Sequence, residues 1–249
     1  MLRKRLFLLT MLSLAALFFI ITVVQFWMSH YMITVLDAPP GSVFVLFTLP
    51  LRALVHEQLA DVAPGPAAAD AWADRMFGHE DWHAFDRGHL TLDEVTERHA
   101  RHFGLARERL EQLFAAIPDR LLPIAPSVDL LARLKALRDA DGGLRLFYLS
   151  NMPEPYARIL EQRYDFLRWF DGGIFSGDVQ AIKPEARIYH LLAERHDLAP
   201  ERTVFIDDMP ANVQAAQALG WHGIHFQSPQ QLEAEVLKRL VPPAHIHAA

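Results

Sequence analysis

The chain has 249 residues, of which 51% are apolar and 22% are charged, so it has the composition of a globular protein with one large domain or a domain that carries an insertion. Its net charge of −6 gives no electrostatic reason to expect a nucleic acid as partner. There are no cysteines, which excludes disulfides, thiolate zinc sites and cysteine nucleophiles.

The first segment, residues 1–31, is hydrophobic. Leu6–Ser29 follows three basic residues, contains no charge and is long enough to cross a bilayer as a helix. It lacks the small-x-small cleavage site of a secretory signal. Two interpretations stay open. One is a membrane anchor through residues 6–29; the other is an extension upstream of a natural start at Met32, which corresponds to the cytoplasmic location that we predict.

After Met32 the first predicted element is a strand at Ile33–Leu36, which ends on Asp37. Asp37 is either a carboxylate presented at a strand end or the first residue of a turn, because two prolines and a glycine follow it. A helix is predicted at Leu51–Leu59. The stretch Asp61–Asp70 (DVAPGPAAAD) is predicted as a loop.

Residues 70–117 are predicted to be helical throughout. Trp72, Met76 and Phe77 mark one apolar face, and the capping-box pattern Thr91–Glu94 predicts the start of a further helix. Leu105–Phe114 carries a third helical pattern. Prolines then predict interruptions of the chain at Pro118, Pro123 and Pro126.

Helices and strands alternate strictly in the second half. The predicted helices are Val128–Leu137, Tyr156–Tyr164, Glu185–His196 and Ala211–Leu219, the last with Gly220 as its C′ residue. The predicted strands are Leu144–Ser150, Gly173–Ser176, Thr203–Asp207 and Gly223–Phe226. This order predicts an α/β fold, a doubly wound parallel sheet into which the helical block is inserted. Ligands of such sheets bind at the carboxyl ends of the strands, so the polar residues there are the candidates.

Two of these candidates precede helices. Ser150 and Asn151 offer a hydroxyl, an amide and nearby backbone N–H groups, which can bind an anion or simply cap the helix. Lys183 stands just before a helix, where a cation is unfavourable with the helix dipole. Its position is explained if it holds a phosphate or neutralises carboxylates; the alternative is a solvated surface lysine.

The strongest single signal is the pair Asp207 and Asp208, which ends a four-residue apolar run. Adjacent carboxylates at the edge of a sheet are costly unless a cation lies between them. Oxygen ligands suit Mg²⁺. Asn212 is placed to hydrogen-bond back and fix the loop, and the alternative is a helix N-cap with a spare acid.

These stretches, LSN (149–151), KPEARIY (183–189), FIDD (205–208) and WHAFDRGHLTLDE (82–94), together resemble the haloacid dehalogenase-like (HAD) hydrolase superfamily. The similarity is greatest to its small-sugar-phosphate phosphatase branch, which has a helical cap. The resemblance covers the chain after Met32. It implies a Rossmann-like core built from residues 32–53 and 121–249, with the cap at residues 54–120.

The resemblance further implies a Mg²⁺-dependent phosphohydrolase that forms an aspartyl-phosphate from a small, sugar-phosphate-like substrate. The catalytic residues would be Asp37, the nucleophile, and Lys183. The phosphoryl oxygens would be bound by Ser150, Asn151 and Lys183. The metal would be held by Asp37, Asp207 and Asp208. Asn212 would hold their loop in place by a hydrogen bond without binding the metal itself.

The first motif departs from the family pattern. Pro39 takes the place of the family's second acid, and Pro39 and Pro40 remove two N–H groups from a loop that normally faces phosphate. Val45–Val55 resembles the segment that follows the nucleophile, and aligning it would place Gly41 where the aspartate belongs. A 2-haloacid dehalogenase-like enzyme and a catalytically impaired relative are therefore alternatives.

A different class of enzyme is suggested by His79–His83 (HEDWH), which fits the H-E-x-x-H pattern of zinc proteases. The pattern is short, Gly78 abuts it, and no third ligand is evident. It also lies in the helical block, away from the carboxylates at the strand ends.

Overall fold

The structure, a computed structural model, describes residues 51–141 and 143–240. The predicted strand at Ile33–Leu36, Asp37 and the apolar segment 6–29 lie outside the described residues. Within the described part, no helix is long and apolar enough to span a membrane.

Residues 51–120 are mostly helical, and they contain no strand. They are α2 (Leu51–Gln58), α3 (Pro66–Phe77), α4 (Glu80–Asp86), α5 (Leu92–Phe103) and α6 (Arg107–Arg120). α5 begins with the predicted capping box, in which the Glu94 N–H donates to Thr91 Oγ1 at 3.2 Å and the Thr91 N–H donates to Glu94 Oε2 at 2.8 Å.

Two boundaries in this block differ from the sequence prediction. The loop predicted at Asp61–Asp70 is shorter, because Pro66 opens α3 from a first-turn position in which a proline loses no hydrogen bond. Pro118 does not interrupt the chain but lies inside α6. Its missing N–H would leave the Phe114 carbonyl without a partner, and that carbonyl instead accepts the Tyr156 hydroxyl at 2.9 Å.

The second half alternates as predicted. Its helices are α7 (Ala125–Asp141), α8 (Glu154–Arg163), α9 (Ala186–His196), α10 (Pro210–Ala218) and α11 (Pro229–Leu240), with short 3₁₀ turns η1 (Asp165–Trp169), η2 (Ser176–Asp178) and η3 (Pro200–Arg202). Its strands are β1 (Phe147–Ser150), β2 (Gly172–Phe175), β3 (Val204–Asp207) and β4 (His222–His225). Gly220 follows α10 with φ +86°, the left-handed conformation expected of a C′ glycine. α11 was not predicted.

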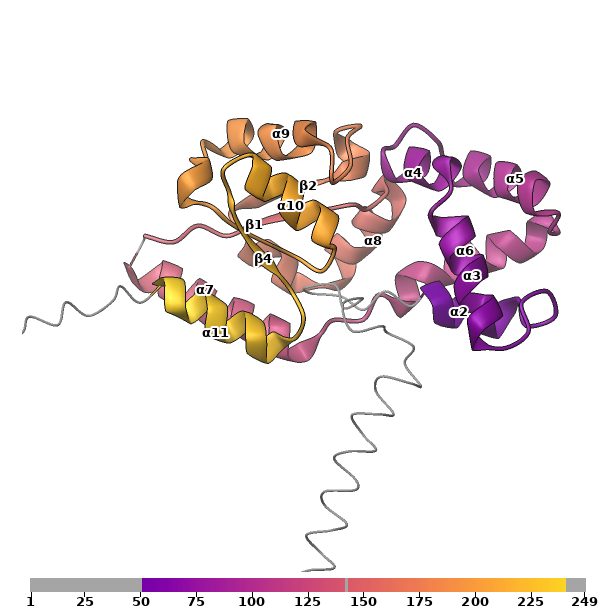
Figure 1. Cartoon of the computed structure of the whole chain (residues 1–249), viewed down its shortest axis with the longest axis horizontal. Coiled ribbons are helices and arrows are strands. Elements are labelled where there is room, and N and C mark those ends of the chain that lie inside the picture. Colours follow the sequence, from indigo (N-terminus) through magenta and orange to yellow (C-terminus); the bar gives the residue numbers. More distant parts are fainter. Residues whose placement is uncertain (1–50, 142, 241–249) are drawn as a thin grey trace, which may run out of the picture. The chain divides into compact units, whose positions relative to one another are not determined.

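The described strands form two parallel pairs. β1 pairs with β2, with Ser150 opposite Phe175, and β3 pairs with β4, with Asp207 opposite His225. Helices cover both faces (Figure 1). Along β3, Phe205 packs with α9 and α10 whereas the next residue, Ile206, packs towards α7 and α11, as the two-residue period of a strand requires. The predicted parallel α/β class is confirmed.

The helical block packs directly on the α/β part. One hydrophobic cluster joins α2–α6 to α8, and the ring centroids of Phe85 and Tyr156 lie 5.5 Å apart where the two meet. Because Tyr156 also supplies the hydroxyl that binds the Phe114 carbonyl, α8 is the element against which the block is anchored.

Candidate functional site

A buried ion pair joins the carboxyl ends of β1 and β3. Lys183 Nζ donates to Asp207 Oδ2 at 2.6 Å and to the Leu149 carbonyl at 2.9 Å. Lys183 retains 4% and Asp207 3% of its exposure. The lysine that the sequence places before a helix is therefore not a surface residue. It spans the distance between two strands that are not paired with each other among the described residues.

The second oxygen of Asp207 is held by its own loop. Asp207 Oδ1 accepts the Met209 N–H and the Asn212 side-chain amide, each at 2.8 Å. The sequence predicts that Asn212 bonds back towards the carboxylates, and this contact is present. With Lys183 on one oxygen and two donors on the other, the carboxylate has a fixed orientation at the end of β3.

Asp208 lies beside this pair and is equally buried, with 3% exposure. Its Oδ2 has no hydrogen-bond partner among the described residues. Burial, together with the negative charge of Asp207, raises the pKa of Asp208 to about 6. A buried carboxylate oxygen without a donor is costly, so it marks a position where a further positive group belongs.

The charges of this cluster fit a divalent cation. Two carboxylates, Asp207 and Asp208, are buried with one ammonium, Lys183, which leaves an excess negative charge. Hard cations such as Mg²⁺ bind oxygen ligands of this kind. The described residues contain no group of three or more His, Asp or Glu side chains placed to hold a metal ion. Asp207 and Asp208 alone would make only part of such a ligand set, and the third predicted ligand, Asp37, lies outside the described residues.

Ser150 and Asn151 are brought to the same edge but do different things. Ser150 Oγ is buried and has no hydrogen-bond partner among the described residues. The Asn151 side chain forms two hydrogen bonds with the main chain of Lys183: its Oδ1 accepts the Lys183 N–H at 2.8 Å and its Nδ2 donates to the Lys183 carbonyl at 3.0 Å. The hydroxyl of Ser150 thus has no described partner, whereas both polar atoms of the Asn151 amide are bonded to the main chain of Lys183.

Sequence reasoning missed Ser176, which lies at the end of β2. Its hydroxyl accepts the Met152 N–H at 2.8 Å and donates to the Asp86 carbonyl at 2.6 Å, so it links the loop after β1 to the end of α4. The rule that polar residues at strand ends are candidates would have found it, because it is the last residue of the predicted strand Gly173–Ser176.

Asp86 and Arg87 were also missed. Burial raises the pKa of the Asp86 carboxyl to about 7, opposed in part by the Arg87 charge. Arg87 crosses from the end of α4 to Glu185, and its Nε lies 3.1 Å from Glu185 Oε1. Both residues stand in the cap-like phrase at 82–94, but nothing in that phrase indicates a partner 98 residues away.

The zinc-protease alternative has different geometry. His79 is the N-cap of α4 rather than a residue of the helix, and its Nδ1 accepts the Asp81 N–H at 3.2 Å. The two histidines of HEDWH therefore do not form the paired face of one helix that this pattern needs.

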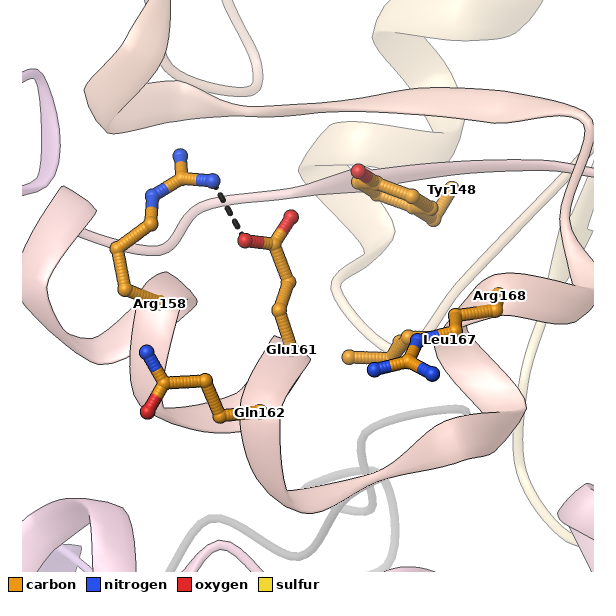
Figure 2. Close-up of a pocket in the computed structure, with 6 residues that line it drawn as sticks. All are labelled: Tyr148, Arg158, Glu161, Gln162, Leu167 and Arg168. Atoms are coloured by element: carbon orange, nitrogen blue, oxygen red, sulfur yellow. Dashed lines mark hydrogen bonds and ion pairs between the residues drawn. The ribbon is translucent and has the colours of Figure 1, made fainter.

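A separate hollow of about 400 Å³ opens between β1, α8 and η1 (Figure 2). It is lined by Tyr148, Arg158, Glu161, Gln162, Leu167 and Arg168. Arg158 is neutralised by Glu161 and Asp178, each with an oxygen 2.5 Å away. None of the strand-end residues lines this hollow, which is therefore distinct from the cluster around Lys183.

Comparison with known proteins identifies the pattern. Residues 24–220 match the family model for haloacid dehalogenase-like hydrolases. A sesquiterpene phosphatase, AstK of Aspergillus oryzae, is 30% identical over 153 residues, which are 61% of this chain and 74% of that protein. The drimenol cyclase DrtB of Aspergillus calidoustus is 26% identical over 68% of this chain, which spans only 32% of that protein. The Escherichia coli K12 phosphoglycolate phosphatase is 36% identical over 78 residues, 31% of each chain.

Solved structures with the same fold belong to the same family. A HAD-like hydrolase of Porphyromonas gingivalis has a TM-score of 0.58 at 22% identity and covers 79% of this chain and 92% of its own. A HAD family enzyme of Bacteroides thetaiotaomicron, solved in complex with magnesium and inorganic phosphate, has a TM-score of 0.55 at 20% identity and covers 72% and 87%.

Proposed function

This chain belongs to the haloacid dehalogenase-like hydrolase family, and from that membership and the geometry at the sheet edge we propose that it is a Mg²⁺-dependent phosphatase of small phosphorylated metabolites. The observation that carries the proposal is the set of three buried groups at one edge. Ser150 Oγ and Asp208 Oδ2 have no partner among the described residues, and the Lys183–Asp207 ion pair lies at the same edge. A bound anion would be held by the Ser150 hydroxyl and the Lys183 ammonium. A bound cation would be held by the two carboxylates.

We assign the nucleophile to Asp37. Lys183 bridges β1 and β3, which are not paired with each other among the described residues. The support for this assignment is the sequence: Asp37 ends the predicted strand Ile33–Leu36, which is where the family resemblance implies the nucleophile. Residues 32–53 and 121–249 then form the core and residues 54–120 the cap.

The reaction proposed for this arrangement has two steps. A carboxylate oxygen of Asp37 bonds to phosphorus as the bond to the leaving alcohol breaks, and water then hydrolyses the aspartyl-phosphate. The ammonium of Lys183 and the hydroxyl of Ser150 stabilise the charge on the phosphoryl oxygens. Asn151 keeps the lysine in place through its main chain. Bound Mg²⁺ would be held by Asp207, Asp208 and Asp37 and would neutralise the same developing charge.

Small organic phosphates are the proposed substrate class, and two relatives support it by name, the sesquiterpene phosphatase and the phosphoglycolate phosphatase. Their leaving groups differ in size and polarity, so the shared chemistry is hydrolysis of a phosphate monoester. The cytoplasmic location remains a prediction from the sequence.

The test is p-nitrophenyl phosphate hydrolysis by the purified protein. We expect activity with Mg²⁺, loss of activity in EDTA, and a fall of at least about 10³-fold in kcat for Asp37→Asn and Asp207→Asn. Asp165→Asn is the matched control, because the Asp165 side chain is 87% exposed. Activity that is unchanged in Asp37→Asn would overturn the assignment of the nucleophile. Chloride release from 2-chloropropionate without phosphatase activity would favour the dehalogenase alternative.

A further inference from the structure

One ion pair connects the helical block to the segment that carries Lys183. Arg87 Nε donates to Glu185 Oε1 at 3.1 Å, and Nη2 contacts the same oxygen. Arg87 is the residue that ends α4, and Glu185 is the residue that precedes α9. Both side chains are partly shielded from solvent, with 27% and 38% exposure, so the pair is weakened by water less than a fully exposed one.

The backbone around Arg87 is docked closely. Gly88 has φ +73°, and a Cβ at this position would lie 2.5 Å from the Gly177 carbonyl oxygen. Ser176, the neighbour of Gly177, donates its hydroxyl to the Asp86 carbonyl. The turn 86–88 therefore packs directly on the segment that follows β2, which fixes the position of the Arg87 main chain.

Glu185 in turn closes the loop of the lysine. Its N–H donates to the Ile182 carbonyl at 2.9 Å, which makes a tight turn with Lys183 inside it. Asn151 holds the main chain of Lys183 from the core. The main chain of Lys183 is thus held by Asn151 from the end of β1, and the turn that contains it ends on Glu185, whose side chain contacts Arg87.

We propose that Arg87 is a positioning residue for catalysis: through Glu185 it fixes the turn 182–185 and so aims Lys183 Nζ at Asp207 and the phosphoryl group. The inference rests on the proposed function and adds to it a link between the docked helical block and the lysine. A guanidinium can place two N–H groups on one oxygen, whereas the ammonium of a lysine cannot reproduce that geometry.

The test compares Arg87→Gln with Arg101→Gln. Arg101 is an arginine of the same helical block whose partner, Glu97, lies on its own helix, so it is the matched control. We expect about a tenfold fall in kcat for p-nitrophenyl phosphate in Arg87→Gln with a smaller change in KM, because a misplaced lysine weakens the transition state more than the bound substrate. Arg101→Gln keeps the wild-type values.

Hydrogen exchange supplies a readout that does not depend on activity. The Glu185 amide and its neighbours at 182–186 should exchange faster in Arg87→Gln than in wild type, and Arg101→Gln should leave them unchanged. The reversed pair Arg87→Glu with Glu185→Arg should recover exchange protection and kcat relative to Arg87→Glu alone. Arg87→Lys should recover them only in part.

The two proposals fail in different ways. A wild-type protein without phosphatase activity contradicts the proposed function. Hydrogen exchange then still tests whether the Arg87–Glu185 ion pair fixes the turn 182–185. If Arg87→Gln matches Arg101→Gln in both kcat and exchange, or loses thermal stability with kcat unchanged, Arg87 has a structural role only and the inference is overturned.

Discussion

Lys183, Asp207 and Asp208 each retain 3–4% of their exposure, so every charge in this cluster has been removed from water. Desolvation of a charge costs several kcal/mol unless a partner compensates it. Lys183 compensates Asp207 through a contact of 2.6 Å, but Asp208 Oδ2 has no compensation among the described residues. At the scale of the residue, the buried carboxylate of Asp208 therefore lowers the stability of the folded protein unless a further positive group compensates its charge.

The carboxyl of Asp86 provides a pH-dependent test at the same scale. Its pKa is about 7 in the folded protein and near 3.8 in the unfolded chain, so between these values the folded state holds a proton that the unfolded state has released. The stability that this group contributes is complete below about pH 4 and is lost as the pH rises through about 7. The neighbouring groups are the Arg87 guanidinium and the Tyr156 hydroxyl, whose pKa is raised by burial.

Asp86→Asn should therefore stabilise the protein relative to wild type at pH 8 and change it little at pH 4.5. The upper limit of the gain is about 4 kcal/mol, at about 1.4 kcal/mol per pKa unit. Urea unfolding of both proteins at the two pH values measures it, with Asp165→Asn as the exposed control. An equal effect at both pH values would show that Asp86 is ionised in the folded state.

At the scale of the element, close backbone contact decides how the helical block meets the α/β part. Gly88 needs both its left-handed φ and its missing side chain, because a Cβ would meet Gly177 O at 2.5 Å. Gly177 shares the steric part of this constraint, since its own Cβ would lie 2.5 Å from the Glu154 N. Three segments, the end of α4, the loop after β2 and the start of α8, thus touch through main chain.

Gly88→Ala is expected to destabilise the protein by about 2–4 kcal/mol, because it adds a steric clash to the cost of a positive φ. Gly104→Ala is the control: Gly104 has φ +65°, but a Cβ there would meet no atom within 4 Å. Only the conformational cost of about 1 kcal/mol then remains. Thermal and urea unfolding compare the two variants. Equal losses would mean that the contact between Gly88 and Gly177 is loose enough to admit a methyl group.

At the scale of the whole molecule, folding and ligand binding are linked through the excess negative charge at the sheet edge. A ligand that binds only the folded state raises the free energy of unfolding, by about 2.7 kcal/mol when it is present at a hundred times its dissociation constant. We expect Mg²⁺ to raise the melting temperature and EDTA to abolish the increase.

Asp208→Asn should change the melting temperature differently in the absence and in the presence of Mg²⁺. Without Mg²⁺ it should melt at a higher temperature than wild type, because one buried negative charge is gone, and with Mg²⁺ its melting temperature should hardly rise. Asp165→Asn should behave like wild type in both conditions. A Mg²⁺-dependent increase of wild-type size in Asp208→Asn would exclude Asp208 from the metal site.

Much of the fold follows from short stretches of sequence. The alternation after residue 128, the capping box at Thr91 and the glycine after α10 were predicted and are present. The failure at Pro118 has a tertiary cause. Pro118 continues α6 because a tyrosine on α8 takes over the carbonyl that the proline frees.

The sequence by itself determined which residues stand at the strand ends, because strand periodicity and turn chemistry are properties of neighbouring residues. It therefore placed Ser150 and Asp207 at the ends of predicted strands and Lys183 just before a predicted helix. Only the tertiary structure decided what each side chain touches there: Asn151 holds Lys183, Ser150 Oγ is buried without a described partner, and Arg87 reaches Glu185. These contacts join segments 32–98 residues apart, and which distant segments meet is settled by packing of the whole core rather than by any local pattern.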